Sequence, residues 1–439
     1  MKKFIQTIKN IYKIEELRKR IVYTLLLILV YRLGSFIVLP GIDPSVIAEF
    51  SASMSNRTDA LSLLNMFSGG AFGNVSIFAL GVMPYISASI VVQLLGVFVG
   101  KFRKMQAEES GRRKLNQITR LLTIVILCIQ GPAYISNIMH QYPNAFLVSS
   151  KLYILAATVI LLGGSMFVMW LGERITERGI GNGISLIIMI GIIARLPQAF
   201  MAEVLSKAGS TTGGILLLIV EFVILFFVFV AAIALVQAVR KVPVQYANRV
   251  IGNKQYGGVR QYIPLKVNAS GVMPIIFAQA IMLFPIIFSR FDATRGFAAA
   301  MSNYTGLWYN LVFGFLVIVF TYFYTAVTFQ PNMMAEDMKK NGGFIPGVKP
   351  GKKTMEYLDT IMTRIVLPGS IFLAIIAVLP AIATLCGVNN QFASFYGGTS
   401  LLILVGVVLD TLQQVESHLL MRHYDGLMKT GRLTGRSGM

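Results

Sequence analysis

Gly81-Val82-Met83-Pro84-Tyr85-Ile86-Ser87-Ala88 has a near copy in Gly271-Val272-Met273-Pro274-Ile275-Ile276-Phe277-Ala278, and six of the eight positions are identical. Each copy stands early in a long apolar segment and carries a proline where a membrane helix would be kinked or broken. The match predicts equivalent helices in two related halves, with a pore between them. A chance match in a sequence rich in Gly, Val, Met and Ile is the alternative.

The composition is that of a membrane protein. The 439 residues are 55% hydrophobic and 13% charged, whereas soluble domains carry about 25% charged residues. A run of about 20 apolar residues is long enough to cross a bilayer as a helix. We therefore expect an all-α polytopic protein with ten spans, at 21–39, 75–99, 118–138, 152–171, 183–200, 214–239, 271–289, 307–330, 365–386 and 399–415.

The distribution of basic residues predicts the orientation. With the N-terminus in the cytoplasm, the segments placed inside hold 32 of the 39 Lys and Arg residues, and the outer loops hold 6. Cytoplasmic loops of membrane proteins carry such an excess of positive charge. Both termini are therefore expected on the cytoplasmic side.

Ten spans divide into five and five at the loop around 201–213. An odd number of spans in each half makes the second half enter from the opposite side, so related halves are inverted. The expected organisation is an amphipathic segment 1–20 at the cytoplasmic surface, a half over 21–205, a half over 206–415 and a cytoplasmic tail over 416–439. A disordered basic leader is the alternative for residues 1–20.

One apolar segment is too short to span. Residues 61–74 precede the second span on the outer side and contain Gly69, Gly70 and Gly73. Non-spanning backbone is tolerated at membrane depth only where protein surrounds it. The segment is predicted either to be a re-entrant half-helix that stops a pore or to cap the outer face.

The centre of the expected pore is apolar. Val82 and Ile86 share one helix face, and Ile184 shares a face with Ile188 on the fifth span. A ring of such side chains would exclude water and ions and still yield to a flexible chain. Simple packing between helices is the alternative interpretation for any single isoleucine.

The sequence indicates no catalytic site, cofactor or metal site. Arg32, Glu221 and Asp410 are the chief charged residues in the expected spans, where a structural ion pair or an interfacial position is the preferred interpretation. No nucleophile stands beside a convincing histidine base. Cys128 and Cys386 fall in apolar runs and are expected to be buried and unpaired.

Two inner loops are longer than simple connections need to be. Residues 240–270 carry six basic residues, no acidic residue and three interleaved tyrosines, which suits an acidic or RNA-bearing partner. Residues 331–364 contain a turn-dense stretch, Gly342 to Gly351.

From about Tyr31 to Tyr424 the chain resembles the SecY family, the channel subunits of bacterial Sec translocons. The matching stretches are Arg32-Leu33-Gly34-Ser35-Phe36, Pro40-Gly41-Ile42-Asp43, Asn65-Met66-Phe67-Ser68-Gly69-Gly70, 76–90, Glu109-Ser110-Gly111-Arg112-Arg113-Lys114, Trp170-Leu171-Gly172-Glu173, 175–185, Pro264-Leu265-Lys266-Val267-Asn268 and 396–403.

The resemblance implies a protein-conducting channel of two hinged five-helix halves in the bacterial plasma membrane. It implies a plug at Phe67, Ser68, Gly69 and Gly70, and a lateral gate where Ser87 faces Phe284. The pore-ring positions it implies are Val82, Ile86, Ile184, Ile188, Ile276 and Ile403.

The implied partners are the SecE and SecG subunits, the SecA motor ATPase, the ribosome through its rRNA, signal sequences, nascent chains and membrane lipid. SecA or the ribosome would dock on the inner loops, at Arg240, Lys241, Arg249 and Lys349. Lys349 departs from the family, which usually has arginine there, and a lysine lacks the bidentate fork. Pro243 also departs, replacing a β-branched residue.

Two other functions fit parts of the pattern. A secondary transporter can share the inverted five-plus-five design, but it places charged or polar groups at the membrane midplane, where this chain offers isoleucines. An intramembrane hydrolase would need a nucleophile beside a base. The sequence therefore favours a channel driven by a partner, and not an enzyme.

Overall fold

The computed structural model describes residues 14–47, 65–147, 151–208, 214–246, 249–251, 254–256, 260–282, 296, 300–301 and 305–430. The chain divides into two compact units. The first holds the described residues through Arg195 together with those from Val407 onward, and the second holds Leu196–Gly406. The boundaries at 205 and 415 expected from the sequence stay predictions.

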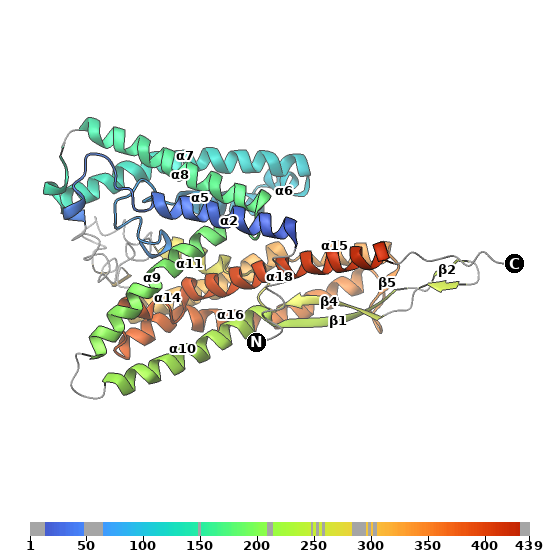
Figure 1. Cartoon of the computed structure of the whole chain (residues 1–439). Helices are drawn as coiled ribbons and strands as arrows, with labels where there is room; N and C mark the ends of the chain where they lie inside the picture. Colours follow the sequence, from blue (N-terminus) through green and yellow to red (C-terminus); the bar gives the residue numbers. More distant parts are fainter. Residues whose placement is uncertain are drawn as a thin grey trace. The chain divides into compact units, whose positions relative to one another are not determined.

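The first unit is a layer of helices. Its elements are α2 (Glu15–Gly34), α5 (Met83–Phe98), α6 (Gly100–Ala107), α7 (Glu109–Gln141), η1 (Pro143–Ala145), α8 (Lys151–Arg178) and the first part of α9 (Gly183–Ala208). The helix α8 packs against both α7 and α2, as can be followed in Figure 1. Leu127 and Ile135 of α7 meet Leu161 of α8 in a core that also includes Val75 and Leu80.

The second unit combines helices with a small sheet. Its elements are α10 (Gly214–Gln237), β1 (Val239–Tyr246), β2 (Arg249–Ile251), β3 (Lys254–Tyr256), β4 (Arg260–Lys266), α11 (Met273–Met282), α14 (Leu307–Thr328), α15 (Pro331–Lys340), β5 (Gly343–Phe344), α16 (Lys352–Leu385), α17 (Asn390–Ala393) and the first part of α18 (Gly398–Thr430). The helix α14 packs against both α11 and α16.

Seven helices of the described part are long and apolar enough to cross a membrane. They are α7, α8, α9, α10, the run Leu307–Lys340, α16 and α18. The other three expected spans coincide with α2 and with the shorter apolar helices α5 and α11. The total of ten spans stays a prediction.

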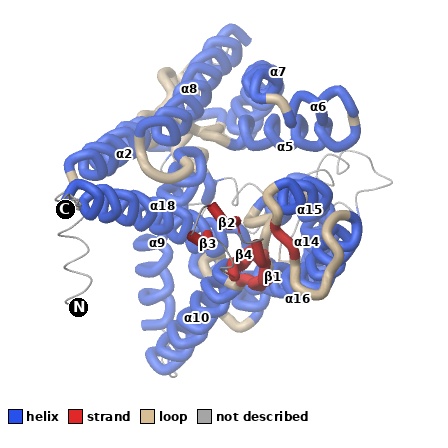
Figure 2. The backbone as a smooth tube through the Cα atoms, turned by 90° about the vertical axis from the view of Figure 1, so that its right-hand side faces the viewer, coloured by secondary structure: helices blue, strands red, loops and turns tan. Residues whose placement is uncertain are grey.

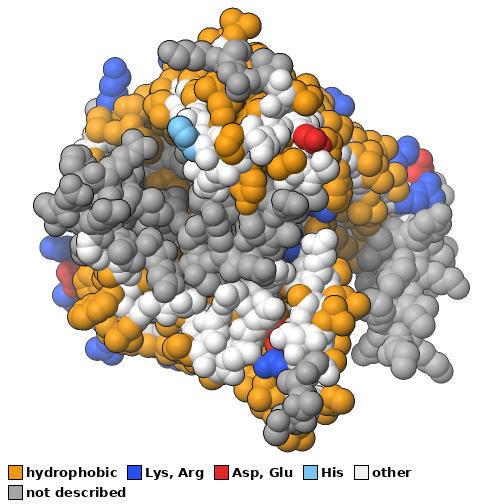
Figure 3. All heavy atoms as spheres, turned by 90° about the vertical axis from the view of Figure 1, so that its left-hand side faces the viewer, with side chains coloured by type: hydrophobic (Ala, Val, Ile, Leu, Met, Phe, Trp, Pro, Cys, Tyr) orange, Lys and Arg blue, Asp and Glu red, His pale blue; other side chains and the backbone are white. Residues whose placement is uncertain are grey.

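Apolar side chains on the outside of the spans fit a lipid surface. On α10, Ile215 and Leu216 are 73% and 71% exposed. Figure 3 shows hydrophobic side chains gathered mainly near the edges of the view, with charged side chains in small groups. A soluble protein seldom exposes apolar area on this scale, whereas hydrocarbon surrounds a membrane helix on its outer side.

The expected burial of the two cysteines is wrong. Cys128 of α7 and Cys386, which follows α16, are both exposed and unpaired. An apolar run in a spanning helix includes the face turned to lipid as well as the face turned to protein. Hydropathy alone therefore does not predict which side chains are buried.

The inner region expected to be a loop, 240–270, contains strands. β1 pairs antiparallel with β4 and also with β5, while β2 pairs with β3. On β1, Val242 and Val244 point into a core and alternate with exposed residues, which is the pattern of a strand with one buried face. Figure 2 shows β1 and β4 beside α15 and α16, whose residues complete that core.

Candidate functional site

The two sequence copies have the same local backbone. Gly81 and Gly271 both have positive φ, 51° and 62°, a conformation that glycine adopts without a steric penalty. The helices α5 and α11 then begin at Met83 and Met273, and each has its proline in the first turn. Of the two expectations, a kink or a break, the structure shows the break: each proline starts a helix, where the missing N–H has no helical partner to lose.

The first unit carries four of the predicted pore-ring residues. Val82 immediately precedes α5 and is buried, and Ile86 lies on the first turn of α5 and is half-buried. Ile184 and Ile188 lie on α9, half-buried and buried respectively. The structure therefore places these residues at the starts of two helices that each follow a glycine-containing turn.

The second unit carries the other two, Ile276 on α11 and Ile403 on α18. The side-chain amide of Gln279 donates to the hydroxyl of Thr399 over 3.2 Å. A Cβ built on Gly406 would lie 3.8 Å from Val272 Cγ2. Residue numbers rise along one helix as they fall along the other, so α11 and α18 run antiparallel. Ile276 and Ile403 lie between these two contacts, at the same height along the helix pair.

The predicted plug is almost completely buried within its unit. Residues 65–67 form one helical turn and residues 68–75 continue as turns, so the expected half-helix is short in the part described, and 61–64 lie outside it. The side chain of Asn65 accepts the N–H of Gly73 over 2.8 Å, and Ser68 Oγ accepts the N–H of Phe72 over 3.0 Å. These bonds hold the segment in a compact, irregular fold.

Two glycines and one strained residue explain why this segment is not a helix. Gly69 and Gly70 have φ of 65° and 92°, which a helix cannot accommodate. Val75 also has a positive φ, 45°, at a cost on the order of 1–3 kcal/mol for a β-branched residue. Such a conformation persists only where the surroundings enforce it, and here Val75 is fully buried in the core of the unit.

One residue of the predicted lateral gate can be located. Ser87 is half-buried on α5, and its hydroxyl donates to the Met83 carbonyl one turn earlier over 3.1 Å. Phe284 lies outside the described residues. The pairing of the two residues stays a prediction.

Two predicted docking residues lie on one strand. Arg240 and Lys241 of β1 are exposed, opposite Leu265 and Pro264 of β4. The next residue, Val242, is buried in the core formed by β1, β4, α15 and α16. The two exposed charges therefore stand on a packed surface. Arg249 is located on β2.

Lys349 is exposed in the turn between β5 and α16. Its carbonyl accepts the Thr354 hydroxyl over 3.0 Å, and Gly347 and Gly351 on either side have positive φ. The second inner loop therefore closes onto the start of α16. It joins the first through β1 and β5, so the two loops that the sequence treats separately form one packed region.

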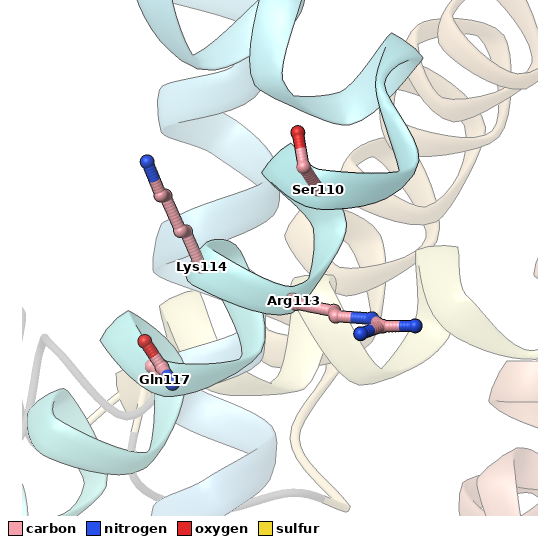
Figure 4. A pocket seen from close by; sticks show the side chains of 4 residues that line it. All are labelled: Ser110, Arg113, Lys114 and Gln117. Carbon is pink, nitrogen blue, oxygen red and sulfur yellow. The ribbon is translucent and has the colours of Figure 1, made fainter.

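A further hollow lies at the start of α7. It has a volume of about 490 Å³ and is lined by Ser110, Arg113, Lys114 and Gln117. Figure 4 shows Ser110 and Lys114 pointing to one side of the helix while Arg113 points another way. Its exposed lining is mostly the aliphatic parts of these polar side chains. Among the described residues, no group of three or more His, Cys, Asp or Glu side chains could hold a metal ion.

The SecY family model matches residues 76–412, which include the two repeat copies, all six residues of the predicted ring and the inner sheet. The chain belongs to the SecY family. It is 39% identical to "Protein translocase subunit SecY" of Chlamydia trachomatis, with 98% of this chain and 99% of that protein covered. It is 41% identical to the subunit of the same name from Thermus thermophilus, over 97% of this chain and 98% of that protein.

Solved structures resemble this SecY-family chain in fold. One described as "The structure of a protein conducting channel" has a TM-score of 0.56 at 17% identity and covers 91% of this chain and 92% of its own. Another, on "the plug domain of the SecY protein", has a TM-score of 0.60 at 18% identity with the same coverage. The polytopic helical fold predicted from the sequence is confirmed.

Proposed function

We propose that the protein is the central pore-forming subunit of a Sec translocon in the bacterial plasma membrane. It passes unfolded preproteins across the membrane and releases transmembrane segments sideways into lipid. The observation that carries this proposal is the buried segment 65–75, a compact stretch of turns that does not span the membrane and precedes α5, in a chain of the SecY family. Short irregular backbone of this kind at membrane depth needs a protein wall around it.

In this function the six apolar side chains of the predicted ring form the seal. Hydrated ions would lose their water in an apolar constriction, and a polypeptide would push the flexible side chains apart. The matching level of Ile276 and Ile403 supports this role for the second unit. Phe67, Ser68, Gly69 and Gly70 act as the plug of the resting channel.

The route into lipid is proposed along α5. Ser87 would face Phe284 across the lateral gate, so that a signal sequence or a new membrane helix leaves the pore between them. Ser87 is half-buried and its hydroxyl bonds within its own helix, which supports this role because the hydroxyl needs no polar partner from a passing helix.

The partner that drives transport is proposed to dock on the inner sheet. One structural neighbour is "Sec61 in the Canine ribosome-channel complex", at a TM-score of 0.51 and 16% identity. The exposed charges of Arg240 and Lys241, with Arg249 and Lys349, suit rRNA phosphates or an acidic surface of SecA. SecE and SecG would complete the complex, and both termini would lie in the cytoplasm.

Reconstitution tests the proposal. The purified protein, with SecE and SecG, is placed in vesicles, and protease-protected preprotein is measured after SecA and ATP are added. We expect protection that requires all components. A transporter would instead move a small solute with no partner, and absence of protected preprotein from an otherwise active system would contradict the proposal.

A further inference from the structure

Two adjacent residues of α2 hold the plug by its backbone. The hydroxyl of Tyr31 donates to the carbonyl of Ser68 over 3.2 Å, and Arg32 Nη1 donates to the carbonyl of Gly69 over 3.1 Å. Tyr31 is 1% exposed. Neighbouring donors on one helix therefore hold neighbouring acceptors of a segment that lies 37 residues further along the chain.

These bonds matter because of the backbone that they satisfy. The positive φ of Gly69 and Gly70 turns the chain away from helical geometry, so the carbonyls nearby lose helical partners; the Ser68 carbonyl still accepts the N–H of Ala71 over 3.3 Å, beside the bond from Tyr31. A buried carbonyl without a donor is costly, and a bond from a charged guanidinium is stronger than a neutral one. The ring of Phe36 lies 5.0 Å from the Arg32 guanidinium and helps to fix its position.

The helix α9 supplies the seat on which the plug lies. A Cβ built on Gly191 would lie 2.9 Å from the carbonyl oxygen of Phe67 and 3.1 Å from the amide nitrogen of Gly69. A Cβ built on Gly69 would lie 2.7 Å from Gly191 Cα. Backbone meets backbone here, so neither position has room for a side chain.

We propose that Tyr31, Arg32 and Gly191 are positioning residues that form a latch and seat for the plug and set how often the channel opens. This inference rests on the proposed role of 65–74 as a stopper. Gly191 lies three residues after Ile188 on α9, so the seat and this predicted ring residue share one face of that helix. Movement of α9 at the ring would therefore disturb the seat.

Single-channel recording in planar bilayers tests the latch. Tyr31→Phe removes one oxygen atom, Arg32→Met removes the charged donor, and Gly191→Ala adds one methyl group to the seat. Each should raise the frequency of spontaneous opening, by about tenfold for a lost buried hydrogen bond. Tyr31→Phe carries the test if the other two variants fold poorly, because it keeps the ring and its stacking on Phe78.

Matched controls separate the latch from general damage. Tyr153→Phe removes another tyrosine hydroxyl that donates to a backbone carbonyl, here that of Pro40 over 2.9 Å and not one of the plug. Gly163→Ala changes a glycine of α8 whose added Cβ meets nothing within 4 Å. Both should leave the opening frequency as in the parent.

The same substitutions in a channel that lacks residues 65–73 complete the test. That deletion should open transiently by itself, and the three substitutions should add nothing, since their partners are gone. If the deletion opens but the substitutions leave the full chain silent, the latch is wrong and the stopper stands. If the substitutions add openings after deletion, they act on the helices and not on the plug. A deletion as silent as the parent would overturn the stopper itself.

Discussion

Lys207 of α9 and Glu221 of α10 form a buried ion pair, with Nζ 3.1 Å from Oε1. Lys207 also lies 3.8 Å from Glu203 Oε1 and donates to the carbonyl of Gly387 over 2.9 Å. Glu203 in turn accepts the N–H of Asn389 over 2.8 Å. The group ties the facing ends of two helices to the segment after α16, and it confirms the interpretation of Glu221 as one member of a structural pair.

Lys207→Met should destabilise the protein strongly, because the buried carboxylates of Glu203 and Glu221 would lose the cation that lies beside both of them. Removing one partner of a buried pair costs about 3–5 kcal/mol in the free energy of unfolding. Thermal or denaturant unfolding in detergent measures it. Lys353→Met is the control, since the Lys353–Glu356 pair at 2.9 Å is exposed and should matter little. Equal losses in the two variants would contradict the role given to Lys207.

Ile403→Asn should raise the ion leak through the resting channel. A polar amide in an apolar constriction gives water a hydrogen-bonding partner and weakens dewetting. Conductance in planar bilayers measures the leak, and Ile86→Asn should act in the same direction. Ile403→Leu keeps the position apolar and should leave the channel closed. Unchanged conductance in both Asn variants would count against the ring.

Reversing two charges on β1 should weaken docking. Arg240→Glu with Lys241→Glu should reduce binding of ribosomes or SecA by about tenfold or more, with the largest effect at low salt. Binding to the reconstituted protein is measured against ionic strength. The control reverses Arg113 and Lys114, another adjacent basic pair that is exposed, on α7. Equal loss in both double variants would mean that only overall charge matters.

Leu358→Ala should loosen the inner sheet. Leu358 of α16 is fully buried in the core that joins Val242 and Val244 of β1 to α15. Truncating such a leucine costs about 2–5 kcal/mol. Amide hydrogen exchange should rise in β1 and β4 and stay unchanged in α7 and α8. Tyr357→Ala, at an exposed neighbouring position, is the control, and equal exchange in the two variants would refute the shared core.

The expected spans were predictable because hydropathy is a local property. Each apolar run that the sequence predicts coincides with a helix, although some helices extend beyond their runs, such as α16, which begins at Lys352, and the first of the two copies starts its helix late, at Met83. The copies themselves show why. Proline and a glycine with positive φ favour the start of a helix over a kink, and hydropathy does not distinguish apolar turns from an apolar helix.

The sequence by itself determined that the chain enters the membrane, where its basic segments gather, and which positions carry apolar side chains at the two related helix starts. A bilayer imposes these features on every segment separately, since each span must satisfy its own backbone. Tertiary structure alone decided that Tyr31 and Arg32 bind the plug, that Lys207 is the partner of Glu221, and that two distant inner loops share one core. Those contacts join residues far apart in the chain, and no local pattern specifies which buried donor meets which acceptor.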